Sequence, residues 1–542
     1  MNMNWVIAIR EFVMGKPVIV LATVTVLLFS STLFHGFLWD DYPLVVENPL
    51  VKHNDFSNFL SLDYWKELSP EERGRLRPVR TLSFMLDHAV FGSNAFGYHL
   101  TNVLIHTANV VLIYLIGVTL FKSKGAAFVC ALLFAVHPVH VESVAWIKNR
   151  SDMLAALCML VSVYALLRLE GVKKAVIIAV SLGGAVLSKE IAVMLPFILI
   201  GAAYLFMPRE KRPIHLAWLT GLIVLIVAFL IFKEIYWRKE ITEGYTIVMD
   251  AYVQTRIVFY TLSTYLGLLM APVALVAERD VNFDLTAIQS FGPGLFIFLV
   301  LGALLAAGYY LLQRQRLSDY LSNAVRNGGF SYLWLFLTLL PIANFVFIES
   351  RPIADQRLYI PSIGFCFLAG AVLQLILVYE KKYLKAPMVI VETAAVFLLI
   401  LFGVSTVSYS AAFRNQHALW ENILQKNPTH YRANYNMGVE YQKRHDYAQA
   451  VSYYEIASRD CDRPEVFYAL GFSYDQMGEY ERSLQNYSKV TQIADRPVPD
   501  VYNNMGIVYE KSGDKKSARV FYAKALEVAP DFVPARKNLE RL

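Results

Sequence analysis

Cysteine and charge are both scarce in this chain, and each shortage excludes a class of protein. Four cysteines among 542 residues are too few and too scattered for a disulfide framework. Only 17% of the residues are charged, and a net charge of +6 does not indicate nucleic-acid binding. Apolar residues make up 56% of the chain, and the mean hydropathy is +0.42. This composition predicts a polytopic membrane protein rather than a soluble enzyme.

The first apolar run, residues 17–37, lacks a small-residue cleavage pattern and is long enough to cross a bilayer, so we expect a retained anchor. Arg10 and Lys16 precede it, which favours a cytoplasmic N-terminus. With this run we expect about eleven spans. The other ten lie near residues 99–121, 125–136, 152–168, 172–187, 191–207, 214–232, 294–312, 331–347, 359–379 and 387–409. Segment 257–276 breaks the alternation of basic loops, so we interpret it as a re-entrant segment or a buried hairpin.

A repeated pattern fills the end of the chain. Gly438, Gly471 and Gly506 recur at intervals of 33 and 35 residues, each with a tyrosine at +3, a small residue at +12 and a tyrosine at +16. This period is typical of tetratricopeptide repeats, in which small residues let paired helices pack closely. We therefore predict an all-α chain. A membrane helical bundle over 1–410 precedes an external α-solenoid of about three and a half repeats over 411–542.

Such arrays present concave peptide-binding surfaces, although a rigid spacer is the alternative. We expect the binding residues to be unpaired polar or aromatic side chains near the starts of the first helices. The candidates for acceptor binding are Asn434, Asn436, Tyr468, Asn503 and Asn504.

Two adjacent carboxylates, Asp40 and Asp41, follow the first span and open a large external loop, residues 38–98. A charged pair so close to lipid is costly unless it faces water, a cation or a polar cavity. The pair either ends a helix in the headgroup region or belongs to a functional site. Loops on the same side mix carboxylates with Arg, Lys and His, which suits a ligand with an anionic phosphate and a reaction that needs a base.

The other loop residues also have simpler interpretations. His137 and His140 with Glu142 could ligate a metal, but helix capping and headgroup contact fit the adjacent proline better. Lys189 and Glu190 could simply pair with each other, and the arginines of the last loop could snorkel to headgroups. The sequence leaves a divalent metal open and requires no cofactor.

Short motifs occur in order along the chain and end in the repeat array. They are Asp40-Asp41, Arg77-Pro78-Val79-Arg80, Leu133 to Glu142, Arg150-Ser151-Asp152, Ser188-Lys189-Glu190 and Arg357-Leu358-Tyr359. The most specific is His137-Pro138-Val139-His140. Together they resemble the transmembrane and tetratricopeptide-repeat-containing proteins, a family of protein O-mannosyltransferases within the class C membrane glycosyltransferases.

The resemblance implies roles for the loop residues. Class C enzymes use a carboxylate of the first external loop, which puts Asp40 or Asp41 in the position of the base. The family's donor is dolichol-phosphate mannose. The array is shorter than in the family and no eukaryotic-style leader is seen, so we expect a prokaryotic relative with undecaprenyl phosphate as an alternative carrier. Candidate donor-phosphate residues are Arg77, Arg80, Arg150, Lys189 and Arg357. Supporting polar residues are His137, His140, Glu142, Asp152, Glu190 and Arg351.

We therefore predict a glycosyltransferase that moves a sugar from a polyprenyl-phosphate donor in the bilayer to Ser or Thr hydroxyls of a protein on the external face, with inversion. Transfer to a glycan or lipid is one alternative, and a non-catalytic membrane scaffold is another. A scaffold, however, has no need of carboxylates facing arginines at span ends. A transporter fits less well, because the polar residues cluster in external loops rather than at the midplane.

Overall fold

A computed structural model shows a chain built from helices. It describes residues 13–59, 77–208, 250–273, 275–279, 292–314, 318–345, 353–379, 389–459, 462–494 and 496–542, with the isolated positions 11, 61, 210 and 221. Within those ranges the only pairing of extended backbone is a single bridge between Arg279 and Ile353. The chain divides into two compact units, Met1–Asn415 and Gln416–Leu542.

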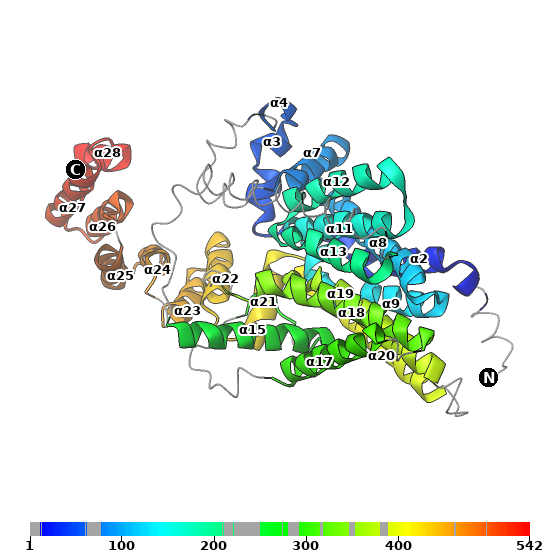
Figure 1. Cartoon of the computed structure of the whole chain (residues 1–542). Helices are drawn as coiled ribbons and strands as arrows, with labels where there is room; N and C mark the ends of the chain where they lie inside the picture. Colours follow the sequence, from blue (N-terminus) through cyan, green and yellow to red (C-terminus); the bar gives the residue numbers. More distant parts are fainter. Residues whose placement is uncertain are drawn as a thin grey trace. The chain divides into compact units, whose positions relative to one another are not determined.

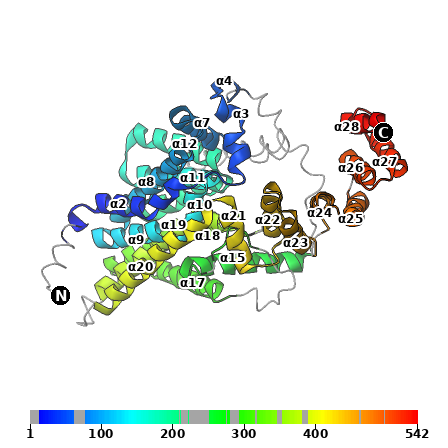
Figure 2. The ribbon, with the colours of Figure 1, turned by 180° about the vertical axis from the view of Figure 1, so that it is seen from behind.

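The first unit is a bundle of long helices (Figure 1). The long helices are α2 (Pro17–Leu28), α7 (Pro78–Phe91), α8 (Ala95–Phe121), α9 (Lys124–Val136), α11 (Arg150–Arg168), α12 (Gly171–Ser188), α13 (Leu195–Phe206), α15 (Ala251–Met270), α17 (Pro293–Gln313), α18 (Asp319–Leu339), α19 (Pro361–Tyr379) and α20 (Val389–Ser410). Helix α8 packs against α2, α9 and α11, while α18 packs against α17 and α19. The view from behind shows the same neighbours (Figure 2).

Short helical elements lie between the long helices of this unit or at its end. They are η1 (Ser30–Phe34), η2 (Tyr42–Val46), α3 (Pro49–Lys52), α4 (Phe56–Phe59), η3 (Pro138–His140), α10 (Val141–Ala145), η4 (Ile147–Asn149), η5 (Glu190–Met194), η7 (Leu340–Ile342), η8 (Asp355–Leu358) and η10 (Ala411–Phe413). Asn48 is the N-cap of α3, and its side-chain oxygen accepts a hydrogen bond from the Leu50 N–H, as is usual for an asparagine at this position. The described start of the loop after the first predicted span, residues 38–59, thus contains short helices.

The bundle is an integral membrane domain. Five of its described helices are long and apolar enough to cross a membrane, and the bent pair α9 with η3 and α10 makes a sixth if it is one span. The five are Ala95–Phe121, Ile147–Arg168, Gly171–Ser188, Pro293–Gln313 and Thr393–Phe413. The total of eleven stays a prediction, and nearly all of the span expected at 214–232 lies outside the described residues. Segment 257–276 largely coincides with α15, which is not among these helices.

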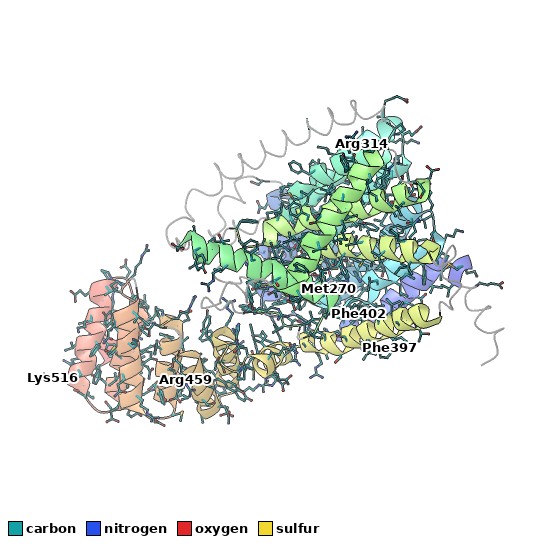
Figure 3. All side chains as sticks on the ribbon, turned by 60° about the horizontal axis from the view of Figure 1, so that its bottom comes forward. Met270, Arg314, Phe397, Phe402, Arg459 and Lys516 are labelled. Carbon is teal, nitrogen blue, oxygen red and sulfur yellow. The ribbon has the colours of Figure 1, made fainter. Side chains whose placement is uncertain are left out.

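Polar side chains satisfy backbone carbonyls where the helices of the bundle break or end. The Thr406 hydroxyl donates to the Val136 carbonyl at 2.7 Å, at the bend between α9 and η3. Interhelical hydrogen bonds of this kind replace the water that lipid cannot provide. On the same helix Phe397 is 61% exposed whereas Phe402 is 7% exposed and lies against the His137 ring (Figure 3). Helix α20 therefore has one face toward the surroundings and one toward the bundle.

The second unit is a stack of helix pairs of the tetratricopeptide type. Its helices are α21 (Gln416–Lys426), α22 (Tyr431–Lys443), α23 (Tyr447–Ala457), α24 (Pro464–Gln476), α25 (Tyr480–Ile493), α26 (Pro499–Lys511), α27 (Lys515–Val528) and α28 (Val533–Arg541). A Cβ atom added at Gly471 would lie 2.7 Å from the Tyr487 ring, and Gly438 and Gly506 meet the tyrosines sixteen residues further on in the same way. The repeated glycines and tyrosines of the sequence are therefore the contact between the two helices of each pair.

Changing Gly471 to Ala should destabilise this pair. Alanine by itself favours a helix over glycine by about 0.5–1 kcal/mol, so any loss must come from the overpacked Tyr487 ring, at about 1–3 kcal/mol. Hydrogen exchange of α24 and α25 in the full chain should be faster in the variant. Gly183→Ala in α12 is the control, because nothing lies within 4 Å of its added Cβ. Unchanged exchange in Gly471→Ala would show that the close contact does not constrain the pair.

Candidate functional site

The two adjacent aspartates have different environments. Asp41 is fully buried, and its carboxylate accepts hydrogen bonds from the Leu38 and Lys148 N–H groups, both at 2.8 Å. Asp40 has a 19% exposed side chain and pairs with the Lys148 ammonium group. Burial raises the pKa of Asp41 to about 7, although its two N–H donors oppose the shift. Asp41 therefore joins the first loop to η4, and Asp40 is the more accessible carboxylate.

The Lys148 ammonium group lies close to two indole rings. Its Nζ atom is 3.8 Å from the centre of the Trp146 ring and 5.5 Å from that of Trp39, and the two rings stack with centroids 6.4 Å apart. Cation–π contacts of this kind hold an ammonium group in place. None of these three residues was among the sequence candidates. The available signal was a lysine in the same short polar stretch as the predicted residues Arg150 and Asp152.

Arg150 lies in the interior of the bundle, with all three guanidinium nitrogens bonded. It contacts Asp87 at 2.6 Å, the Asn102 side chain at 2.6 Å and the Tyr98 carbonyl at 2.7 Å, and it also donates to Ser83. These contacts tie α7, α8 and α11 together. Complete burial and saturation argue against the phosphate-binding role that the sequence indicated for Arg150, and we do not retain it in the donor site.

A second charged cluster forms where α7, α11 and η5 begin. Arg77 donates to the Ser151 hydroxyl at 3.1 Å and to the Glu190 carboxylate at 3.2 Å, while the Lys189 ammonium pairs with Asp152. Asp152 is buried, whereas the Glu190 side chain is 46% exposed. The structure thus brings together two predicted phosphate-binding cations and two predicted supporting carboxylates. We refer to Arg77, Ser151, Asp152, Lys189 and Glu190 as the Arg77–Lys189 cluster.

The two charged groups share one short piece of chain. Lys148 belongs to η4, and Ser151 and Asp152 belong to the first turn of α11. Arg150 lies between them in sequence and anchors this segment in the bundle. The Asp40–Lys148 pair and the Arg77–Lys189 cluster are therefore held by a common, rigidly fixed turn.

The histidine motif is buried structure. His140 bonds through Nδ1 to the Phe134 carbonyl and through Nε2 to the Ser362 hydroxyl, both at 2.7 Å, and His137 Nε2 donates to the Leu269 carbonyl at 3.0 Å. His137 also caps η3 by accepting from the Val139 N–H, which fits the capping interpretation, whereas complete burial excludes the headgroup contact expected with it. Among the residues that the structure describes, no three His, Cys, Asp or Glu side chains are placed to hold a metal ion.

Three of the remaining bundle candidates, Glu142, Arg80 and Arg357, are described by the structure. Glu142 is buried and accepts a hydrogen bond from the Gln356 N–H at 3.0 Å, which joins α10 to η8. Arg80 is buried on α7 near the Phe84 ring, and Arg357 is partly buried. Arg351 lies outside the described residues.

Within the repeats, the five acceptor-binding candidates all have hydrogen-bond partners. Asn434 and Asn436 donate to carbonyls of the preceding helical turn, and Asn503 accepts from a side chain of α28. Asn504 donates to the Tyr468 hydroxyl at 2.9 Å, across two repeats. The expectation of unpaired side chains is wrong, because these residues bind the array itself. Of the five, Asn504 and Tyr468 are partly exposed, and acceptor binding stays a prediction.

Comparisons with known proteins agree with this architecture. Residues 78–237 match the family model described as Dolichyl-phosphate-mannose-protein mannosyltransferase, and residues 464–496 and 499–532 match tetratricopeptide-repeat models. The matched part of the bundle contains the whole segment that carries Lys148, Arg150 and Lys189.

Several curated proteins are similar in sequence to this chain. Protein O-mannosyl-transferase F38B6.6 of Caenorhabditis elegans is 24% identical over 78% of this chain and 59% of its own length. Protein O-mannosyl-transferase TMTC3 of Mus musculus is 22% identical over 89% of this chain and 55% of its own length. Protein O-mannosyl-transferase TMTC1 of the mouse is 40% identical over 26% of this chain and 16% of its own. The chain thus spans less than two thirds of the length of these relatives.

Replacing Asp41 with Asn should remove one source of pH dependence from the stability of the bundle. The pKa of Asp41 rises from 3.8 to about 7 on folding, so its stabilising contribution is full below about pH 4 and is lost as pH rises to about 7. The loss is at most a few kcal/mol, at about 1.4 kcal/mol per unit of pKa.

The measurement is the Tm of the detergent-purified full chain between pH 4 and 8. The difference between wild type and Asp41→Asn should fall over this interval and level off above about pH 7. A constant difference would mean that Asp41 is ionised in the folded protein throughout.

Proposed function

We propose that the chain is a membrane glycosyltransferase. It transfers a sugar, with mannose as the first candidate, from a polyprenyl-phosphate donor to Ser or Thr hydroxyls of a protein on the external face. The match to the mannosyltransferase model and the names of the relatives support the reaction class. The observation that carries the proposal is the partly exposed Asp40 carboxylate, which lies beside a fixed cation at the end of a membrane bundle.

In the proposed reaction Asp40 is the general base. Its carboxylate takes the proton of the acceptor hydroxyl while the hydroxyl oxygen forms a bond to the anomeric carbon of the sugar. The bond from that carbon to the phosphate oxygen breaks on the opposite side, its electrons leave with the lipid phosphate, and the configuration inverts. The leaving group is the lipid phosphate, which is a stable anion and needs no proton in order to leave. Positive charge that stabilises this anion therefore matters more than a general acid.

Arg77 and Lys189 are the proposed donor-phosphate residues. Both side chains lie at helix ends, and arginine and lysine are the residues that hold phosphate oxygens in proteins. In the structure Arg77 pairs with Glu190 and Lys189 pairs with Asp152. A phosphate can take the place of the exposed Glu190 carboxylate on Arg77, whereas the buried Asp152 stays with Lys189.

The orientation of the chain follows from its basic loops, which the positive-inside rule assigns to the cytoplasm. Under that rule the N-terminus is cytoplasmic, and the polar loops and the repeats are external. The repeats are proposed to recruit the acceptor protein, with Tyr468 and Asn504 as the most accessible of the candidate contacts. The scaffold alternative does not account for two groups of charges on one anchored turn.

The first test is the replacement of each aspartate by Asn in the purified full chain. Asp40→Asn keeps the size of the side chain but removes the base, so transfer should fall by roughly two to four orders of magnitude. Binding of the lipid-linked donor should be retained, because cations hold its phosphate. Asp41→Asn is the comparison, in which the loss of rate per folded molecule should be smaller, because Asp41 is buried. Normal transfer by Asp40→Asn would remove Asp40 from the mechanism.

The second test asks whether the Arg77–Glu190 ion pair is part of the phosphate site, by removing the charge of each partner in turn. Arg77→Gln should raise the KM for the donor roughly tenfold or more, because a charge-assisted hydrogen bond to the phosphate is lost. Glu190→Gln should lower it by about two- to five-fold, because an exposed ion pair that competes with the phosphate is worth about 0.2–1 kcal/mol. Glu465→Gln in the repeats is the matched control, since Glu465 also pairs with an arginine and is also 46% exposed. Changes of the same sign in Arg77→Gln and Glu190→Gln would exclude this cluster as the phosphate site.

A further inference from the structure

We propose that Lys148 is the positioning residue of the base: it orients the Asp40 carboxylate, keeps it ionised, and is itself held by Asp41 and two tryptophans. This inference rests on the proposed role of Asp40 as the base. It goes further because it gives three residues different roles. Asp40 is the base, Asp41 holds the main chain of Lys148, and Lys148, which was not among the sequence candidates, positions Asp40.

The geometry starts from the double contact of Lys148 with the aspartate pair. Its main-chain N–H donates to Asp41 at 2.8 Å, and its side-chain ammonium pairs with Asp40. One residue of η4 therefore fixes two consecutive residues of the first loop. Asp41 is buried, so water cannot readily replace the Lys148 N–H as its hydrogen-bond donor. Loss of this contact would leave a buried carboxylate without one of its donors, which is costly.

The tryptophans restrict the side chain in turn. A lysine side chain has four rotatable bonds and ordinarily loses much conformational entropy when it is held in one geometry. Here the Nζ atom lies on the Trp146 ring and near the Trp39 ring, and Trp146 is itself buried. The ammonium group is thus in place before a substrate binds, and it restricts the orientation of the Asp40 carboxylate with which it pairs.

The charge has a chemical consequence as well as a geometric one. Lys148 and Asp41 both lie beside Asp40, and the guanidinium of Arg150 acts on Asp41 from the interior. A cation beside a carboxylate favours its ionised form, and a neighbouring carboxylate disfavours it. Lys148 therefore opposes the effect of Asp41 and keeps Asp40 able to accept a proton at lower pH.

The experiment is the pH dependence of kcat/KM for the purified full chain. Lys148→Met removes the charge and should move the acid limb of the profile to higher pH by about one unit or more, because the base is then protonated more easily. It should also lower kcat about tenfold or more through loss of orientation, with the donor KM unchanged. Lys148→Arg keeps the charge and should leave the acid limb near its original place, although the wider guanidinium fits the two rings less well.

Lys511→Met is the matched control, because Lys511 pairs with Asp475 at 2.6 Å within the repeats. It should leave the acid limb where it is. An unchanged acid limb in Lys148→Met, with Tm showing a folded protein, would overturn the proposal. If Lys148→Met does not fold, the Lys148→Arg profile decides, since a shift in a variant that keeps the charge contradicts the electrostatic role. Asp40→Asn distinguishes failure of this proposal from failure of the proposed function. Normal activity of Asp40→Asn would contradict the role of Asp40 as the base, whereas an unchanged acid limb in Lys148→Met contradicts only the role of Lys148.

Discussion

A buried guanidinium is the constraint on which the rest of the site depends. Arg150, in the first turn of α11, lies wholly inside the bundle, and its partners belong to α7 and α8. A charge without water is tolerated only when it is paired and its hydrogen bonds are satisfied, so these helices cannot shift independently. The turn that includes Arg150 is therefore fixed, and the reactive side chains on either side of it are fixed with it.

The same constraint explains why the candidate site is a set of neutral pairs. Lys148 balances Asp40, Lys189 balances Asp152, and Arg77 balances Glu190. Near lipid an isolated charge would be costly, whereas paired charges can be separated when a substrate supplies the replacement. The more exposed member of a pair is the one that a substrate can displace or use. In the proposed function Asp40 is accordingly the base and Glu190 the group that the donor phosphate displaces, while the buried Asp41 and Asp152 have supporting roles.

In the repeats, polar side chains that resemble ligand contacts are occupied by the array itself. Asn503 bonds to the last helix, and Asn504 reaches from α26 to Tyr468 on α24. Stacked repeats are stable only through contacts with their neighbours, so amides at the interfaces stabilise the stack. The array's role in acceptor selection consequently depends on the partly exposed side chains rather than on the buried amides.

The sequence by itself determined the architecture, because its signals are local. Apolar length predicts membrane helices, and the glycine and tyrosine spacing predicts repeat pairs that close-contact geometry then explains. It also brought the aspartate pair and the charged loops forward as site candidates. Only the tertiary structure decided which aspartate is buried, that Arg150 is internal, and that Lys148 belongs to the site. Adjacent residues look alike in sequence, whereas their exposure here is set by a hydrogen bond to a residue 107 positions away, and such a contact leaves no local pattern.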